Sequence, residues 1–599
     1  MTPFGGDAIA WGCVSAALAA SFAAWRVSRR GRFVMAALLL ATAGIFLRAN
    51  LSERHWLSDW DERYHAVVGR NAMDEPLLPR VVRVPFDEYS VRNWGQTPVW
   101  LHKPPLATWM IGASLAVFGE SERAVRIPSI LFAGLGILLT FLIGRRMLGA
   151  PVGLLAAGLH AWHARLAQLA AGLRATDHVD HQFTVLVELG VYAALCTSDA
   201  LSRSPRGFRG WFLATLCGLV LGLALLTKSL PALVIAGVLA IALLVAAVPW
   251  AVRIAAPAYV VALGWLVQLP WQLYTERAFP EHAAYAAARN AYYFTEVVAG
   301  QGGPPWFYLT DMADVFGWLA PVAVGLFLLH VACRRELWPL AGWLGAAYGI
   351  FSLSQTKMTA YVLIAAPVVM LALAWVWVEA WRVQATVGTR WAWRALAVVL
   401  AVGFLVGSVA RVHRPWRHPE RRTLWAEELR YFGEQVTALG EGPWLIFNAP
   451  SRQEARFYTR ETVVSRPPSA DDLSRALERG FRVAIYGEPA GAPSATEGLV
   501  FIPHDPRASA HREILRQLPR PPRRREVWLW NARDPDALEE YLERTVRVDV
   551  RERIPDEADL KRVLSAEGVV AILVEPGAPD PSMPVGYAWT RVESEAFAR

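Results

Sequence analysis

The chain has 599 residues and a net charge of +8, and 54% of its residues are hydrophobic. Several apolar runs reach the roughly 18–20 residues needed to cross a hydrocarbon core of about 30 Å, which excludes a soluble globular protein. The arginines lie mostly in short loops between these runs and in a polar tail, as they do in membrane proteins. The positive charge therefore does not indicate a nucleic-acid partner, and we expect none.

Residues 1–410 are expected to form an α-helical polytopic membrane domain with about 11–13 transmembrane helices. The first segment, Ala8 to Arg26, is weakly apolar, and we expect an extra span or an interfacial helix there. With the spans given below, the Arg-rich loops all fall on one face, which is the cytoplasmic face because cytoplasmic loops gather Lys and Arg. The expected spans are 33–50, 126–144, 151–170, 180–197, 211–227, 230–248, 254–270, 306–329, 337–354, 360–380 and 392–410.

The opposite, outer face receives the first large loop, residues 51–125, together with several shorter polar loops. Within this loop, the apolar run Lys103–Gly119 would invert the charge pattern if it crossed the membrane. Its roughly 15 apolar residues are also too few for a full crossing. We therefore expect an amphipathic or re-entrant helix along the outer interface.

Residues 411–599 differ in kind from the rest of the chain. Apolar runs of strand length occur at 444–448, 481–487, 526–531 and 569–575, and charge-rich, helix-like stretches occur at 469–480 and 534–545. Strands that alternate with helices are typical of α/β domains. We expect a soluble α/β domain here, on the outer side of the membrane.

Charged side chains from distant parts of the sequence meet on the outer face of this topology. Each has an ordinary alternative, because a lysine at a span end can extend toward the interface and Thr176–Asp177 fits a helix N-cap. Neighbouring helical residues point about 100° apart, so only one of Asp61 and Glu62 is expected to face a shared cleft. The outer-face charges are Asp61, Glu62, Asp177, Asp180, Lys103, Arg174, Lys228, Arg289 and Lys357.

The chain contains short motifs, none of which is specific for a protein family by itself. Their order along the chain is specific. The ordered set resembles the GT-C superfamily of membrane glycosyltransferases, in particular the branch of protein O-mannosyltransferases and bacterial lipid A aminoarabinose transferases. The resemblance covers about Phe33 to Pro367. The motifs are D-E-R-Y (61–64), H-K-P-P-L-x-x-W (102–109), F-G-E-S-E-R-A-V-R-I-P-S (118–129), G-R-R (144–146), L-R-A-T-D (173–177), L-T-K-S-L-P (226–231), P-W-F-Y (305–308) and S-x-T-K-M-T-A-Y (354–361).

The resemblance implies a polyprenyl-phosphate sugar donor and a site on the outer face of the membrane. The acceptor stays open among lipid A, another glycan, a lipid and a protein hydroxyl. The Ala- and Arg-rich composition and the expected positive-inside loops favour a bacterial inner membrane. It implies that Asp61 is the essential acid, with Glu62 beside it, and that Asp177 also belongs to the catalytic set. For the donor phosphate, the positions that the resemblance or the outer-face charges indicate are Lys103, Lys228, Lys357, Tyr361, Arg289 and Arg174.

The chemistry of such a transfer accounts for these residue types independently. An acceptor hydroxyl that attacks the anomeric carbon must lose a proton, and a carboxylate can take it, as a general base worth about 10²–10⁴ in rate. The leaving phosphate needs fixed positive charge where its negative charge develops, and lysines supply that charge. We expect Asp61 to be the base and Lys103, Lys228 and Lys357 to hold the phosphate.

Two other functions stay open on the sequence alone. The run T-D-H-V-D-H-Q resembles the D-H-H motif of oligosaccharyltransferases, so a divalent metal (Mg²⁺ or Mn²⁺) held by Asp61, Asp177 and His178 is an alternative. A non-enzymatic transporter of lipid-linked sugar would place charges at mid-membrane, whereas most charges here lie at span ends on one face. Asp311 and Asp314 are the exceptions.

Overall fold

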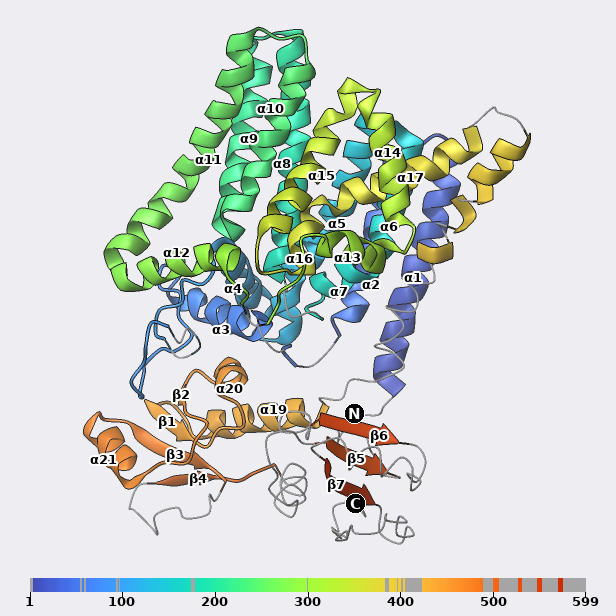
Figure 1. Cartoon of the computed structure of the whole chain (residues 1–599). Helices are drawn as coiled ribbons and strands as arrows, with labels where there is room; N and C mark the ends of the chain where they lie inside the picture. Colours follow the sequence, from blue (N-terminus) through green and yellow to red (C-terminus); the bar gives the residue numbers. More distant parts are fainter. Residues whose placement is uncertain are drawn as a thin grey trace. The chain divides into compact units, whose positions relative to one another are not determined.

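The computed structural model describes residues 4–53, 56–58, 61–92, 95, 97–173, 178–298, 300–382, 387–395, 397–399, 402–404, 423–487, 499–505, 526–530, 547–551 and 569–574. The chain divides into two compact units, Met1–Arg414 and Pro415–Arg599. The first is helical and the second contains the strands, and each is described by itself below (Figure 1).

The membrane unit begins with two helices that pack along each other, α1 (Phe4–Ser28) and α2 (Phe33–Leu51). The first large loop follows and contains α3 (Asp61–Asp74) and α4 (Leu106–Phe118). At 1.5 Å per residue, the 13 residues of α4 extend only about 20 Å, which is too short to cross the hydrocarbon core. This length agrees with the interfacial or re-entrant helix expected for the run Lys103–Gly119.

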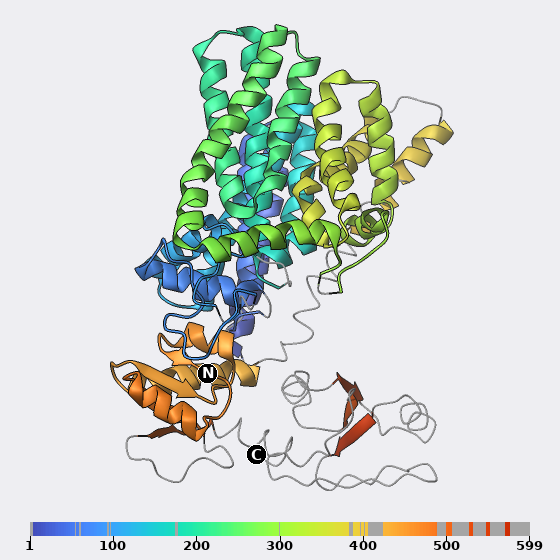
Figure 2. The same cartoon turned by 60° about the vertical axis from the view of Figure 1, so that its left-hand side comes forward.

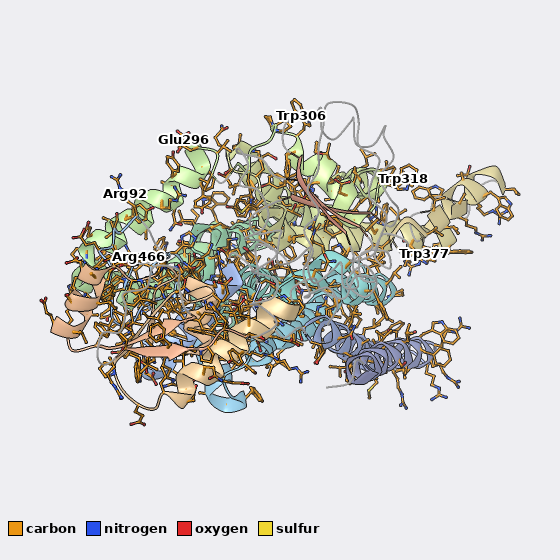
Figure 3. The ribbon with its side chains drawn as sticks, turned by 90° about the horizontal axis from the view of Figure 1, so that it is seen from below. Arg92, Glu296, Trp306, Trp318, Trp377 and Arg466 are labelled. Atoms are coloured by element: carbon orange, nitrogen blue, oxygen red, sulfur yellow. The ribbon has the colours of Figure 1, made fainter. Side chains whose placement is uncertain are left out.

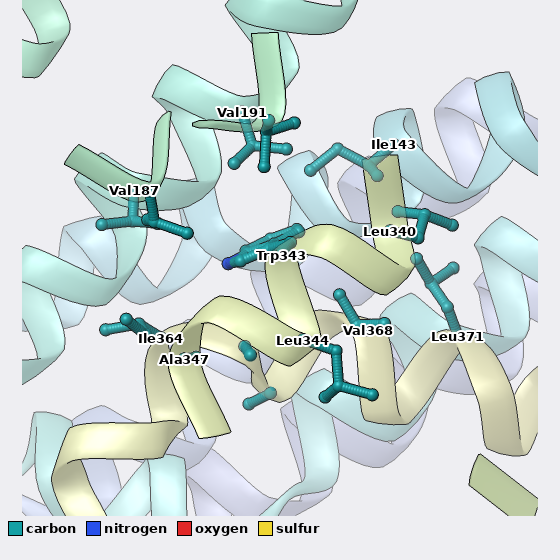
Figure 4. Close-up of a cluster of buried hydrophobic side chains, with 14 of the residues drawn as sticks. Ile143, Val187, Val191, Leu340, Trp343, Leu344, Ala347, Ile364, Val368 and Leu371 are labelled. Carbon is teal, nitrogen blue, oxygen red and sulfur yellow. The ribbon is translucent and has the colours of Figure 1, made fainter. Parts of the chain in front are cut away.

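Long apolar helices form the centre of the membrane unit, where α8 packs on α5 and α9, and α9 packs on α11 (Figures 1 and 2). Their interior is filled by branched aliphatic side chains around the fully buried Trp343 (Figure 4). The helices after α4 are α5 (Glu122–Met147), α6 (Ala150–Trp162), α7 (Ala164–Ala170), α8 (His178–Arg203), α9 (Phe208–Lys228), α10 (Val234–Val245), α11 (Trp250–Ala278), α12 (Pro280–Thr295), α13 (Phe307–Phe316), α14 (Ala320–Ala332), α15 (Trp338–Leu353), α16 (Thr359–Val362) and α17 (Ala366–Arg382).

Two of the expected continuous spans are wrong. The span expected at 151–170 is interrupted at His163, whose extended backbone ends α6 and whose Nδ1 accepts a hydrogen bond from the Leu166 amide at 3.2 Å to start α7. The span expected at 306–329 is bent by 107° between α13 and α14. At that bend Gly317 has φ +103°, a conformation that favours glycine, so the chain turns sharply without steric cost.

Seven helices within the described part of the chain are long and apolar enough to cross a membrane, or up to eight if α13 and α14 count as one span. By length and composition, the described helices therefore account for fewer spans than the 11–13 expected from the sequence. Part of the difference lies in breaks and short helices, because the spans expected at 151–170 and 230–248 contain α6 and the stretch Leu230–Val245, which are apolar but of only 10–17 residues. The chain is an integral membrane protein.

Several polar side chains inside the bundle bind one another or the backbone. Arg48 is fully buried and donates to the carbonyls of Gly44 at 3.0 Å and Ala161 at 2.9 Å. Thr140 Oγ1 lies 2.8 Å from His160 Nδ1 and 3.4 Å from Glu188 Oε2. Buried polar side chains cost free energy in hydrocarbon unless they are paired, and these pairs join α2, α5, α6 and α8.

The second unit has the α/β character expected from its sequence. A four-stranded parallel sheet has the order β2-β1-β3-β4, and a separate three-stranded parallel sheet has the order β6-β5-β7. In the first sheet, Leu445 of β1 pairs with Val483 of β3. The elements are α19 (Thr423–Ala438), β1 (Trp444–Phe447), α20 (Arg452–Tyr458), β2 (Thr462–Val463), α21 (Ala470–Glu478), β3 (Arg482–Tyr486), β4 (Val500–Ile502), β5 (Glu526–Trp530), β6 (Arg547–Arg551) and β7 (Val569–Val574).

Local sequence explains where helix α21 begins. Ser469 caps α21, because its hydroxyl accepts from the Asp472 amide at 3.1 Å and the Asp472 carboxylate accepts from the Ser469 amide at 2.9 Å. Arg466 and Arg475 also bind Asp472, and the hydrogen bond from Arg466 is the main cause that lowers the pKa of this carboxyl. The helix expected at 534–545 lies outside the described residues.

Candidate active site

The membrane unit contains a cavity of about 560 Å³. The helices α3, α12 and α16, which contribute to its walls, lie at the lower end of the bundle in Figure 1. Its walls come from the starts of α3 and α8, the segment before α4, the end of α9, the helix α12 and the chain from 351 to 364. Two carboxylates, three fixed cations and one histidine line it, together with an apolar wall. The polar lining residues include Asp61, Asp180, Lys103, Lys228, Arg289, His102 and Tyr361, and the apolar ones include Phe183, Leu230, Pro231, Phe351 and Ile364.

Asp61 and Glu62, which are adjacent in sequence, have different surroundings. Asp61 is the first residue of α3 and lines the cavity. Glu62 is fully buried, and its carboxylate accepts from Arg126 at 2.7 and 3.2 Å and lies 3.0 Å from His178 Nε2. Burial alone would raise the pKa of Glu62, but Arg126 and His178 outweigh it and hold that pKa well below its usual range. Glu62 is therefore an anion in a buried ion pair and does not line the cavity.

Lys103 and His102 reach the cavity from the segment just before α4. Pro104 and Pro105 fix the backbone here, and Pro105 is the N-cap residue of α4. Burial and then the neighbouring Lys103 lower the pKa of His102 well below its usual value. At neutral pH the imidazole is uncharged, so it adds a hydrogen-bonding group but no further positive charge.

Lys228, the last residue of α9, pairs with Asp180 of α8, and its ammonium lies 4.8 Å from the centre of the Tyr361 ring. All three residues line the cavity. In the sequence, Asp180 is one of the outer-face carboxylates, without an assigned role. The available signal was its spacing, because Asp180 follows Asp177 by three residues in the polar start of a long apolar helix.

The backbone after Lys228 is strained. Ser229 has φ +69° and ψ −145°, a region that is almost restricted to glycine and costs of order 1–3 kcal/mol for other residues. The L-T-K-S-L-P motif thus places a serine where a glycine would relieve strain, directly beside a cation of the cavity.

We expect Ser229→Gly to raise the stability of the folded protein by about 1 kcal/mol, because the relieved strain exceeds the added backbone entropy of the unfolded chain. The measurement is the unfolding midpoint of the detergent-solubilised protein in denaturant. Ser229→Ala is the matched control, since it retains a Cβ and with it the strain. An equal gain in both variants would show that the hydroxyl, and not the backbone, is the cause.

Arg289 reaches the cavity from α12, a helix none of whose residues is fully buried and which lies crosswise to the long helices in Figures 1 and 2. Its guanidinium lies 5.5 Å from the ring of Tyr292 and 5.6 Å from that of Tyr293. Such cation–π contacts hold a guanidinium in place without neutralising it, so Arg289 remains a positive charge at the cavity wall.

Lys357 and Asp311 lie beside the cavity and are not among its lining residues. The ammonium of Lys357 donates to the carbonyls of Phe351 at 3.2 Å, Ser352 at 2.7 Å and Ser354. Asp311 accepts a hydrogen bond from the Thr359 hydroxyl at 2.8 Å. The structure thus brings together Asp61, Lys103, Lys228, Arg289 and Tyr361 from the expected set, and directs Glu62 and Lys357 to other partners.

The expected metal ligands are not assembled by the residues that the structure describes. Arg174 and Asp177 lie outside the described residues. Both ring nitrogens of His178 are engaged, Nδ1 with Ser129 Oγ at 3.0 Å and Nε2 with Glu62 at 3.0 Å. Among the described residues, no group of three or more His, Cys, Asp or Glu side chains is placed to hold a metal ion. His178 therefore does not fit the ligand set that the resemblance to the D-H-H motif indicated.

Comparison with known proteins relates the chain to membrane glycosyltransferases. Residues 102–274, which include Lys103 and Lys228, match the family model described as dolichyl-phosphate-mannose-protein mannosyltransferase. The chain is 32% identical over 274 residues to the undecaprenyl phosphate-alpha-4-amino-4-deoxy-L-arabinose arabinosyl transferase of Pseudomonas aeruginosa (strain LESB58), covering 44% of this chain and 47% of that relative. A counterpart numbered 1 in Pseudomonas fluorescens (strain Pf0-1) is 29% identical over 353 residues, covering 55% of each chain.

The chain thus spans about half the length of the curated relatives it matches. Among solved structures, ArnT from Cupriavidus metallidurans bound to undecaprenyl phosphate has a TM-score of 0.51 at 18% identity, covering 76% of this chain and 88% of that one. At this identity the likeness establishes the fold, which is the GT-C membrane fold. The expected resemblance to the aminoarabinose transferase branch is confirmed.

Proposed function

We propose that this chain is a membrane glycosyltransferase that moves a sugar from a polyprenyl-phosphate carrier to a hydroxyl-bearing acceptor. One observation carries the proposal: a single cavity of about 560 Å³ brings the carboxylate of Asp61 together with Lys103, Lys228 and Arg289 beside an apolar wall. The named relatives transfer a sugar from undecaprenyl phosphate, which supports the same class of donor here.

The cavity lining suits an amphipathic donor. A polyprenyl-phosphate sugar has an apolar chain, one phosphate charge and a polar sugar. Phe183, Leu230 and Ile364 supply apolar surface for the start of the chain, and Lys103 and Arg289 supply charge for the phosphate. Lys228 is partly neutralised by Asp180, so it adds a weaker positive field than the other two cations.

The reaction assigns one role to each kind of group. The acceptor oxygen attacks the anomeric carbon from the side opposite the phosphate, the bond between that carbon and the phosphate oxygen breaks, and the configuration inverts. Asp61 takes the proton of the acceptor hydroxyl. The bond electrons leave with the phosphate, whose developing charge is stabilised by Lys103 and Arg289, so no general acid is needed. Tyr361 lies at the same wall, where its hydroxyl can donate to a phosphate oxygen.

We further propose that the cavity opens to the outer face of a bacterial inner membrane and that residues 411–599 form a domain on the same side. The distribution of arginines along the sequence supports this orientation. Candidate acceptors are lipid A, another glycan, a lipid or a protein hydroxyl, all of which present an oxygen nucleophile.

The test is transfer by the purified chain in proteoliposomes supplied with radiolabelled polyprenyl-phosphate pentose, aminopentose or hexose and an envelope lipid extract. We expect labelled product from at least one donor, with release of polyprenyl phosphate. Movement of labelled donor across the bilayer without any product would favour a transporter instead. Loss of product with a chelator would favour the metal-dependent, oligosaccharyltransferase-like alternative.

A further inference from the structure

Lys357 belongs to a short turn, Ser354–Met358, that joins the end of α15 to α16. A lysine ammonium has three N–H donors, and here three backbone carbonyls at the end of α15 accept from it: those of Phe351, Ser352 and Ser354. The C-terminus of a helix carries unpaired carbonyls and partial negative charge, which a cation stabilises. Lys357 is only 5% exposed. Its three donors are therefore engaged by backbone carbonyls, and Lys357 is not among the residues that line the cavity.

The same turn is hydrogen-bonded to the last residues of α12 and to the described residues that follow this helix, 293–298 and 300–302. The isolated β-bridge between Gly302 and Thr356 marks the contact, and Glu296, at the end of α12, is labelled in Figure 3. Four main-chain amides and two hydroxyls make the connection. The bonds are Gln355 N to Phe294 O at 3.0 Å, Thr356 N to Tyr293 O at 3.2 Å, Lys357 N to Gln301 O at 2.7 Å, Val298 N to Thr356 Oγ1 at 3.1 Å, Thr356 Oγ1 to Glu296 O at 2.8 Å and Ser354 Oγ to Tyr293 O at 2.9 Å.

A third set of contacts holds the other side of the turn. The Met358 amide donates to the Tyr308 hydroxyl at 3.1 Å, and that hydroxyl lies 3.3 Å from the Met358 carbonyl. Asp311, on the same helix α13, accepts from Thr359. The turn is thus connected to α13, α15 and the end of α12, and it leads directly into α16, which contains Tyr361.

We propose that Lys357 is a positioning residue. Its ammonium binds the turn Ser354–Met358 to the end of α15. This turn then holds two parts of the cavity wall in place, namely α12, which contains Arg289, and α16, which contains Tyr361. The inference rests on the proposed function for its consequence in catalysis, but its structural content does not depend on any donor. It replaces the expectation, drawn from the position of the lysine in the S-x-T-K-M-T-A-Y motif, that Lys357 contacts the donor phosphate.

The two roles differ in what they require. A phosphate contact needs a free N–H facing the cavity, and Lys357 would have to give up a backbone carbonyl to provide one. A positioning role needs the contacts between the ammonium and the carbonyls. It also predicts that removing the Thr356 hydroxyl weakens the attachment of the turn to residues 293–298 in the same way as removing the Lys357 ammonium. Lys103, which lines the cavity directly, is the matched comparison for a phosphate contact.

Hydrogen exchange of the full chain in detergent without any donor, together with binding of polyprenyl phosphate alone, separates these roles. In Lys357→Met we expect the amides of 355–357 to exchange about 10-fold faster or more, because their acceptors lie in the released segment. Thr356→Val should give the same pattern and Lys357→Arg should restore part of the protection. Lys103→Met should leave exchange unchanged while weakening binding of polyprenyl phosphate and reducing the salt dependence of that binding.

A phosphate-contact role for Lys357 predicts the reverse result, namely unchanged exchange in Lys357→Met and a loss of binding and salt dependence like that of Lys103→Met. That outcome overturns the proposal. Combining Lys357→Met with Thr356→Val should add little to either alone, because both act on one unit, whereas combination with Lys103→Met should be additive. If the wild type transfers no sugar from any donor, the proposed function is wrong. The hydrogen-exchange measurement still tests whether Lys357 holds the turn.

Discussion

Asp61→Asn is expected to lower sugar transfer by about 10²–10⁴-fold, the usual contribution of a general base, while the protein still folds. The amide keeps the size of the carboxylate but cannot take the proton of the acceptor hydroxyl. Asp61 lines the cavity at the first turn of α3, so the change removes a reactive group and leaves the helix intact. The measurement is the initial rate of product formation with saturating donor and acceptor in proteoliposomes.

Binding of polyprenyl phosphate to Asp61→Asn serves as the control. Because a negative charge is removed next to the cations of the cavity, binding of this anion should be unchanged or slightly stronger in the variant. An inactive variant that still binds the lipid phosphate shows that the lost step is chemical. Transfer at the wild-type rate would exclude Asp61 as the base and would direct attention to Asp180, the other carboxylate among the described residues that line the cavity.

The limits of sequence reasoning are clearest for the breaks in the membrane helices. Composition predicted the apolar segments well, since α2, α5, α8 and α9 lie where long apolar runs occur. It did not predict the break at His163 or the 107° bend at Gly317. A bent apolar helix has the same composition as a straight one, so hydropathy cannot predict the bend. A single glycine or a single capping histidine is too common to indicate one.

The site shows a different limit. Five of the expected residues line the cavity: Asp61, Lys103, Lys228, Arg289 and Tyr361. Four of them belong to the ordered motifs, whereas Arg289 is indicated only by the charges on the outer face. Motif position did not distinguish a residue that faces the cavity from one that holds its wall, as Lys357 illustrates. It also gave no role to Asp180, because its pairing with Lys228 depends on how α8 and α9 pack together.

Glu62→Gln is expected to destabilise the fold by about 3–5 kcal/mol, the cost of leaving one partner of a buried ion pair uncompensated. Glu62 and Arg126 are both fully buried, and Arg126 also donates to the carbonyl of Ser52 at 2.8 Å, so its charge cannot move to solvent. Gly172 approaches so closely that a Cβ on it would clash with Glu62 Oε1. The pair therefore fixes the start of α3, and with it Asp61, against α5 and the chain at Gly172.

The pH dependence of stability distinguishes this role from a catalytic one. The folded-state pKa of Glu62 is lowered, so the stabilisation is fully present above the unfolded-state pKa of about 4.3 and is lost as the pH falls below it. The stability difference between wild type and Glu62→Gln, measured by denaturant unfolding in detergent, should thus be large at pH 7 and shrink toward pH 3. Asp61→Asn, its sequence neighbour, should show little loss of stability at pH 7. If Glu62→Gln were as stable as wild type but inactive, the buried ion pair would not be what holds α3. A catalytic role for Glu62 as well as Asp61 would then be favoured.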